Sequence, residues 1–216
     1  MKFNRNLLIL FLTLVIMLIG FGVIIPLLPA YVTAFGGSGV AMGLLMAIYS
    51  AMQFLFSPMW GALSDRYGRK PILLIGVLGN GITMLLLGLS TRLWMLFAAR
   101  ALAGVLSSAT LPTAMAYIGD STEEKHRSGG MGIIGASMGL GMTLGPGVGG
   151  LFSTISLSAP FYFAAALSLL SMLAIYFFLP ESLSPEHRKK DLRIQGPPLG
   201  EMWHALFGPI GFLLIT

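Results

Sequence analysis

The amino-acid sequence predicts an all-α integral membrane protein, built as a bundle of six transmembrane helices. Of the 216 residues, 56% are hydrophobic and only 10% are charged, with a mean hydropathy of +0.85, whereas a soluble domain normally carries about 25% charged residues. The apolar residues form long runs, and roughly 20 helical residues cross the ~30 Å of bilayer hydrocarbon. The 28 glycines suit membrane helices that pack closely. Lipid is therefore the expected solvent for most of the protein surface.

Six apolar runs are long enough to span a bilayer, and glycine-rich or polar segments separate them. The runs cover about 7–34, 40–63, 72–91, 94–118, 129–155 and 160–179. The first run is longer than the apolar region of a signal peptide, which has about 7–15 residues. We therefore expect it to be retained as a span.

Two further segments follow the six runs. Residues 180–206 are polar and are predicted to form a cytoplasmic linker, and residues 207–216 are apolar again. A run of that length cannot cross a bilayer, so we expect it to begin a truncated seventh helix. We therefore expect a longer protein whose C-terminal six-helix half is missing here. A half-size protein that pairs with a second copy is the alternative.

A modest internal repeat suggests that the bundle consists of two three-helix repeats. The segment "SPMWGALS" (57–64) matches "GPGVGGLF" (145–152) at Pro, Gly and Leu, with a constant offset. Many transporter bundles are built from such repeats.

Basic residues are concentrated in the loops on one side of the predicted bundle. Cytoplasmic loops carry an excess of Lys and Arg, so the N-terminus and the 180–206 linker are predicted to be cytoplasmic. The protein would then be a multi-pass protein of the cell membrane. The basic residues on this side are Lys2, Arg5, Arg66, Arg69, Lys70, Lys125, Arg127, Arg188, Lys189, Lys190 and Arg193. Because the net charge of +5 resides at membrane edges, nucleic acid is not an expected partner.

The predicted spans lack most residue types that enzymes use for catalysis and metal binding. There is no Cys, which excludes disulfides and thiolate metal sites. The predicted spans contain no Asp, Glu or His, so they lack the groups for acid–base catalysis. We therefore expect a protein that is not an enzyme and that needs no metal or cofactor.

The loop "GALSDRYGRKP" (61–71) places charge between two apolar runs. Gly61 is expected to allow close approach of a neighbouring helix, and Gly68 to supply the positive φ of a tight reversal. Pro71 suits the first turn of the next helix. Asp65 is expected to accept backbone N–H groups or to pair with Arg66 or Arg69.

This loop resembles the signature loop between helices two and three of the major facilitator superfamily. In that family the loop is taken to control a conformational switch, and the resemblance implies the same role here. "GFGVIIPLLPAY" (20–31), Asp120 and "LPES" (179–182) also resemble family features. The matching positions of the loop are Gly61, Leu63, Asp65, Arg66, Gly68, Arg69 and Lys70.

Arg100 is the only formally charged residue inside a predicted span. A charge at bilayer depth costs at least about 2.5–3.5 kcal/mol and is rarely present without a partner or a cavity. With Gly104 it resembles the R-x-x-x-G element of helix four, which implies a role in proton coupling or in the binding cavity. The alternative is that Arg100 snorkels to the external face.

The segment "GMTLGPGVGG" (141–150) resembles the helix-five motif associated with exporters of the superfamily. Three of its glycines recur every four residues and share one helix face, where another helix can approach closely. Pro146 removes one helical hydrogen bond and is expected to bend the helix. Ordinary glycine-mediated packing is the alternative explanation. The matching residues are Gly141, Gly145, Pro146, Gly149 and Gly150.

Polar and thioether side chains within the spans are candidates for a substrate cavity. Met and aromatic surfaces re-pack around varied apolar ligands, and a lone amide such as Gln53 usually faces the protein interior. Packing or lipid contact is the alternative for each residue. The candidates are Tyr49, Gln53, Ser107, Thr110 and Met138, with Met46, Asn80, Ser108 and Met115 as further members of the set.

The resemblance implies an exporter of the 12-helix drug/proton antiporter type, working by alternating access on small amphipathic compounds and driven by the proton gradient. An uptake permease for sugars or metabolites is the alternative within transport. A non-transporting membrane scaffold is a more remote one. Because proton-driven exporters commonly use a buried carboxylate, the proton carrier must lie in the missing half or involve Asp65 and Arg100, or the coupling is not to protons.

Overall fold

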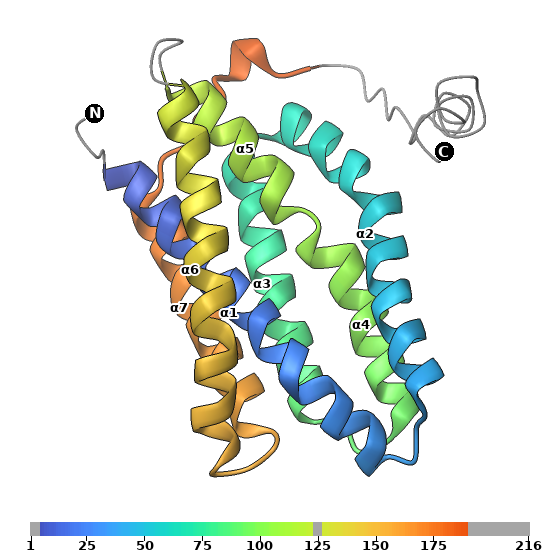
Figure 1. Cartoon of the computed structure of the whole chain (residues 1–216). Coiled ribbons are helices and arrows are strands. Elements are labelled where there is room, and N and C mark those ends of the chain that lie inside the picture. Colours follow the sequence, from blue (N-terminus) through green and yellow to red (C-terminus); the bar gives the residue numbers. More distant parts are fainter. Residues whose placement is uncertain (1–4, 123–126, 190–216) are drawn as a thin grey trace, which may run out of the picture.

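The structure, a computed structural model, describes residues 5–122 and 127–189, and all regular structure in these ranges is helical (Figure 1). The elements are α1 (Arg5–Ala34), α2 (Gly39–Tyr67), α3 (Arg69–Gly88), α4 (Leu93–Ser107), α5 (Thr110–Ser121), α6 (Arg127–Ser153), α7 (Ala159–Phe178) and a 3₁₀ helix, η2 (Pro185–His187).

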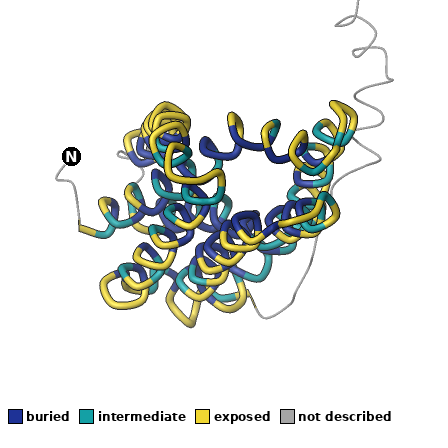
Figure 2. The backbone as a smooth tube through the Cα atoms, turned by 90° about the horizontal axis from the view of Figure 1, so that it is seen from below, coloured by how far each residue is buried: buried dark blue, intermediate teal, exposed yellow. Residues whose placement is uncertain are grey.

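Six helical segments are long and apolar enough to cross a membrane, with α4 and α5 together forming one of them. Figure 2 shows exposed residues along the outward faces of the helices, and many of the exposed residues have large apolar side chains. Soluble proteins rarely expose contiguous apolar surface of this kind. The predicted all-α membrane bundle is confirmed. Examples with 65–75% exposure are Val40, Trp94, Leu151, Ile155 and Phe177.

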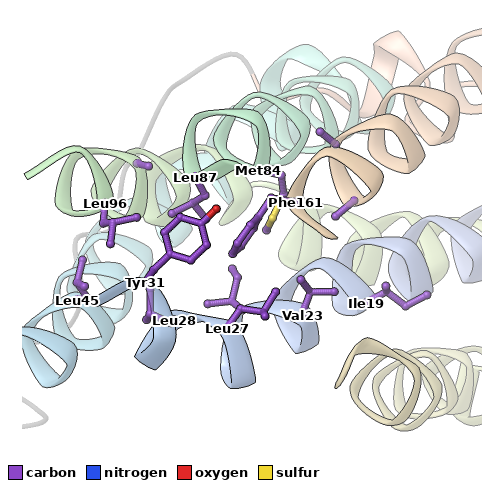
Figure 3. Close-up of a cluster of buried hydrophobic side chains, with 14 of the residues drawn as sticks. Ile19, Val23, Leu27, Leu28, Tyr31, Leu45, Met84, Leu87, Leu96 and Phe161 are labelled. Atoms are coloured by element: carbon purple, nitrogen blue, oxygen red, sulfur yellow. The ribbon is translucent and has the colours of Figure 1, made fainter. Parts of the chain in front are cut away.

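The helices pack in pairs around a buried interior. α1 packs against α6, α3 against α7, and α2 against α4. One core cluster joins α1 to α3, α4 and α7, and Figure 3 shows its side chains converging. In this cluster the Tyr31 ring meets the Phe161 ring edge-on at 5.3 Å. The Tyr31 hydroxyl lies 2.7 Å from the Ser158 hydroxyl, so the cluster ends in a satisfied polar contact.

The reversal between α2 and α3 is tighter than the sequence predicted. α2 continues to Tyr67 instead of ending near residue 63, and Gly68 alone separates the two helices, with φ +110°. The expectation of a positive φ at Gly68 is met. The close approach expected at Gly61 stays a prediction, because no heavy atom of the described residues lies within 4 Å of the position of an added Cβ there.

The fourth span is broken, although the sequence predicted a continuous helix over 94–118. α4 ends at Ser107 and α5 begins at Thr110. Pro112 explains the break, because it has no N–H to donate to the carbonyl of Ser108 and its ring clashes there. At the same place, the Ser108 hydroxyl donates a hydrogen bond to the Val105 carbonyl at 2.8 Å.

The segment after α7 is described up to Lys189. It includes η2 and lies across the end of the bundle where α2 ends and α3 begins (Figure 1). The rest of the predicted linker and the predicted start of a seventh helix at 207–216 lie outside the described residues.

Candidate functional site

A partly open cavity of about 250 Å³ lies between the helices. It is slightly smaller than the roughly 300–1,000 Å³ of typical ligand pockets, and its wall is mainly aliphatic, aromatic and thioether. All helices except α7 contribute to it. The lining residues are Leu14, Met17, Leu18, Phe21, Ile24, Tyr49, Ser50, Gln53, Asn80, Met84, Arg100, Ala103, Ser107, Leu111 and Met138.

Arg100 is the only charged residue among those that line this cavity. It has 0% exposure, so the snorkelling alternative is wrong. Its guanidinium carbon lies 4.2 Å from the centroid of the Tyr49 ring. Its Nε donates to the Leu45 carbonyl at 3.5 Å and its Nη2 to the Met46 sulfur at 3.4 Å. The first bond is long, the second goes to a weak acceptor, and Nη1 has no partner among the described residues.

The structure brings most of the predicted cavity residues together. Tyr49, Gln53, Ser107 and Met138 line the cavity, as does Asn80. Their role in binding remains a prediction, because position alone does not establish it.

Thr110 and Gly104 take other positions. Thr110 is fully buried against the Gly76 position of α3 and is not among the residues that line this cavity. At Gly104, an added Cβ would lie 2.5 Å from the Tyr49 carbonyl oxygen. Gly104 therefore allows α4 to approach α2 closely and so holds Tyr49 near Arg100.

Sequence reasoning missed the contribution of α1 to the cavity. Leu14, Met17, Phe21 and Ile24 line it, but these apolar residues look the same in sequence as those facing lipid or core. The Met and Phe content of α1 was the only available signal.

A polar network supports one wall of the cavity. The Asn80 amide nitrogen donates to the Ser168 hydroxyl at 2.9 Å, and the Ser107 hydroxyl approaches the Asn80 amide oxygen at 3.5 Å. The first bond connects α3 to α7, and the second connects α3 to the end of α4. The network fixes the orientation of the Asn80 amide beside the cavity.

The glycines of 141–150 lie mostly where α6 meets α1. An added Cβ at Gly145 would lie 2.6 Å from the Cα of Gly22, and one at Gly22 would lie 3.3 Å from Pro146. An added Cβ at Gly141 would lie closer still to the Cβ of Leu18. One at Gly149 would have ordinary contacts with Val23, the nearest at 3.6 Å.

Gly150 has a different environment. Nothing lies within 4 Å of a Cβ added there, so its position in the motif has no packing explanation in the described residues. The face shared by the other three glycines is the one that approaches α1.

The predicted switch loop forms a charged cluster around Arg69 at one end of the bundle. Arg69 Nη1 donates to Asp65 at 2.5 Å and to the Ser64 hydroxyl at 2.7 Å. Its Nε donates to Asp120 at 3.0 Å. Arg69 is buried, and it joins the end of α2 to the end of α5. We call this end, defined by Asp65, Arg69, Asp120, Glu181 and Lys189, the charged end.

Glu181 places a carboxylate at the N-terminus of α3. It accepts hydrogen bonds from the backbone N–H groups of Arg69 and Lys70 at 2.8 and 3.2 Å, and from those of Ser182 and Leu183 at 3.0 and 3.1 Å. Anions are stabilised at helix N-termini. Sequence reasoning placed Glu181 only within the "LPES" segment, because the capped helix begins 112 positions earlier in the chain.

Lys189 binds the second oxygen of Asp65. Its Nζ lies 2.7 Å from Asp65 Oδ2, and its backbone N–H donates to the Asp65 carbonyl at 3.1 Å. Asp65 is thus held by Arg69 on one side and by Lys189 on the other.

The remaining residues of the loop play lesser parts. Lys70 Nζ donates to the Tyr176 carbonyl at 2.8 Å, and Arg66 lies over the Tyr67 ring, 5.4 Å from its centroid. Leu63 packs against the cluster that contains Trp60. The expected pairing of Asp65 with Arg69 is present, whereas Arg66 stacks on an aromatic ring. Among the described residues, no group of three or more His, Cys, Asp or Glu is placed to hold a metal ion.

The chain is a multi-pass helical membrane protein, with six helical segments able to span a bilayer, a mainly apolar cavity between them and a charged cluster at one end. The profile of the Major Facilitator Superfamily matches residues 10–216. The chain therefore belongs to the Major Facilitator Superfamily.

Among its relatives, the class C tetracycline resistance protein of Escherichia coli is 39% identical over 206 residues, covering 94% of this chain and 52% of that protein. Multidrug resistance protein 1 of Bacillus subtilis (strain 168) is 33% identical over 212 residues, covering 98% of this chain and 53% of that protein. The chain thus spans about half the length of the curated relatives it matches.

A solved structure with the same fold is the crystal structure of the human organic anion transporter MFSD10 (TETRAN). It superposes with a TM-score of 0.78 at 27% identity, covering 99% of this chain and 55% of that one.

Proposed function

We propose that the chain is the N-terminal half of a secondary active transporter that exports small amphipathic compounds in exchange for protons by alternating access. The observation that carries the proposal is a mainly apolar, partly open cavity between membrane-spanning helices, lined by Met, Phe and Tyr side chains. The relatives named as tetracycline and multidrug resistance proteins support drugs as substrates. In this proposal the protein is not an enzyme and needs no cofactor beyond the proton gradient.

The proposed orientation places the charged end in the cytoplasm. Arg69 and Lys189 bind Asp65 there, and the junction of α2 and α3 lies at the same end of the bundle as the start of α1 (Figure 1). Cytoplasmic loops are enriched in Lys and Arg. The N-terminus and the segment after α7 would then both be cytoplasmic.

The charged end is proposed to act as the conformational switch. Its hydrogen bonds tie α2, α3, α5 and the segment after α7 together at one face. A rocking motion between two halves would change the surroundings of this face, and Asp65 is the residue on which two of its cations converge.

Coupling to protons is proposed to involve Arg100 together with a carrier outside the described helices. No Asp or Glu lines the cavity, and Asp65 and Asp120 lie at the charged end. The close contact of α1 and α6 at Gly22 and Gly145 is proposed to serve the exporter, because the motif that provides it is associated with export.

Export can be tested with a neutral fluorescent probe. Cells producing the full-length protein are loaded with N-phenyl-1-naphthylamine, and loss of the probe is followed with and without a protonophore. We expect efflux several-fold faster than in cells without the protein, and abolished by the protonophore. Efflux that survives the protonophore would remove the coupling to protons. Accumulation of the probe, or of a sugar, would favour the uptake permease, and no transport of any compound would favour a scaffold.

The switch can be tested with Asp65→Asn, which preserves shape but removes the charge that binds Arg69 and Lys189. We expect normal amounts of protein in the membrane and at least a tenfold loss of efflux. Glu186→Gln, an exposed acid in the segment after α7, is the matched control and should keep full efflux. Unchanged efflux by Asp65→Asn would end the switch proposal.

A further inference from the structure

The cavity offers almost nothing but apolar contact to a bound molecule. Met17, Phe21, Met84 and Met138 form much of its wall, from α1, α3 and α6. Such a wall binds the apolar body of varied ligands. Specificity in a site of this kind comes from its few polar groups. Here Arg100 is the only charged one among the lining residues.

Arg100 is a buried cation without a counter-charge. Its two hydrogen bonds go to a backbone carbonyl and a thioether sulfur, both neutral acceptors. Nη1 is buried without a partner among the described residues. A buried, unpaired cation is strongly disfavoured. The arrangement therefore calls for an anion that is not among the described contacts.

Within residues 5–122 and 127–189, no acid is placed to fill this role. The eight acidic residues of the chain are Asp65, Asp120, Glu123, Glu124, Glu181, Glu186, Asp191 and Glu201. Those that the structure describes lie at the charged end or in the segment after α7, and none lines the cavity.

The Tyr49 ring covers part of the Arg100 guanidinium and leaves the rest for a bound molecule. The ring lies against the guanidinium, with 4.2 Å from the ring centroid to Cζ. A planar guanidinium with one face stacked still presents its N–H groups at its edge, where carboxylates and similar anions bind in a bidentate manner. Gln53 lines the same cavity, and its side-chain amide can donate a further hydrogen bond.

We infer that the cavity selects amphipathic compounds that carry an anionic group, with the apolar body against α1 and α6 and the anion on Arg100. This inference rests on the proposed function, because it names the substrate class of the proposed export site. A carboxylate, a sulfonate or an ionised enol satisfies the same chemistry. A carboxylate from outside residues 1–216 is the competing partner, and it would remove the advantage of an anionic ligand.

Three fluorescent probes with one ring system separate these outcomes. They are 1-anilinonaphthalene-8-sulfonate, neutral N-phenyl-1-naphthylamine and a trimethylammonium derivative of the latter. Each is titrated into the full-length protein in nanodiscs of zwitterionic lipid, with protein-free nanodiscs subtracted. We expect the sulfonate to bind at least about tenfold more tightly than the neutral probe, and the cation most weakly. Equal binding of the sulfonate and the neutral probe, or preference for the cation, overturns the inference.

Variants assign the preference to Arg100. Arg100→Met should bring the Kd of the sulfonate to within about threefold of that of the neutral probe, while the neutral probe keeps its affinity. Arg100→Lys should keep a reduced preference, because Lys retains the charge but not the planar fork. Arg92→Met removes an exposed cation at the start of the same helix and should keep the full preference. A preference that survives in Arg100→Met overturns the inference.

Two controls keep the outcomes separate. If Arg100→Met does not fold, judged by its elution and melting, Arg100→Lys decides: a preference identical to that of the wild type would show that the guanidinium is not the anion site. Selective binding of the sulfonate without efflux of any probe would contradict the proposed export function alone. Efflux of the neutral probe without anion preference would contradict this inference alone.

Discussion

Arg69 and Arg100 are two buried arginines of the same chain with opposite surroundings. Arg69 is shared between the carboxylates of Asp65 and Asp120, at 2.5 and 3.0 Å. Arg100 has an aromatic ring, a carbonyl and a sulfur around it, and one terminal nitrogen without a partner among the described residues. Similar burial therefore reflects two different tasks.

The difference shows how to separate a structural charge from a binding charge. A cation that is fully paired within the fold fastens helices to one another, because removing it strands its partners. A cation that is left unpaired costs stability in the empty protein and keeps its hydrogen-bonding capacity for a ligand. The charged end is of the first kind, and the cavity is of the second.

The largest expected effect is the loss of stability in Arg69→Met. Two carboxylates would lose their shared cation, and breaking a buried pair costs about 3–5 kcal/mol. Because Asp65 and Asp120 are about a quarter exposed, we expect the lower end of that range, near 3 kcal/mol. Thermal melting in detergent measures it. Arg66→Met, which removes only stacking on Tyr67, should melt within a few degrees of the wild type, and equal melting of both variants would contradict the contrast.

We expect Arg100→Met to raise the stability of the protein, opposite to the effect of Arg69→Met. Replacing a poorly compensated buried charge with an apolar side chain of similar length often stabilises a protein. The lost contact with the Tyr49 ring offsets part of this gain, since such contacts contribute up to about 2 kcal/mol. We expect a net gain of about 1–2 kcal/mol, seen as a higher melting temperature of the ligand-free protein. Destabilisation comparable to that of Arg69→Met would show that Arg100 is also a structural charge.

A smaller effect is expected for Glu181→Gln. The neutral amide keeps the shape of the cap at the start of α3 but loses the charge–dipole interaction there, so we expect a loss of about 1 kcal/mol. Melting is again the measurement, with Glu186→Gln as the exposed control. If the two variants melt alike, the four N–H contacts of Glu181 contribute little to stability.

The smallest effect is expected for Lys189→Ala. Its side chain is 71% exposed, and exposed ion pairs typically contribute about 0.2–1 kcal/mol and are screened by salt. We expect a melting difference that is detectable at low ionic strength and absent at high salt. A difference that persists in high salt would mean that Lys189 acts through its packing instead of its charge.

The membrane nature and the helical architecture were predictable from sequence because both depend on local properties. The length of an apolar run determines whether a helix crosses the bilayer, and a Gly at position 68 between two such runs indicates a tight reversal. The resemblance of 61–70 and 141–150 to family motifs is likewise contained in short stretches of residues. These observations required no knowledge of which helices touch.

The tertiary structure decided what each polar residue does. Arg100 could have snorkelled or been buried, and only the position of α2 against α4 resolves this, with Gly104 allowing the close approach. Thr110 was expected to line the cavity, but it packs against Gly76 of α3, a contact that its neighbours in sequence do not indicate. The carboxylate of Glu181 reaches α3 across 112 positions. Sequence by itself determined that this chain resides in lipid and where its six spans lie. The reason is that the hydropathy of a span is the sum of its own residues. Arg69 is paired with carboxylates and Arg100 is not paired among the described residues. This difference depends on contacts between distant segments, which only the folded chain defines.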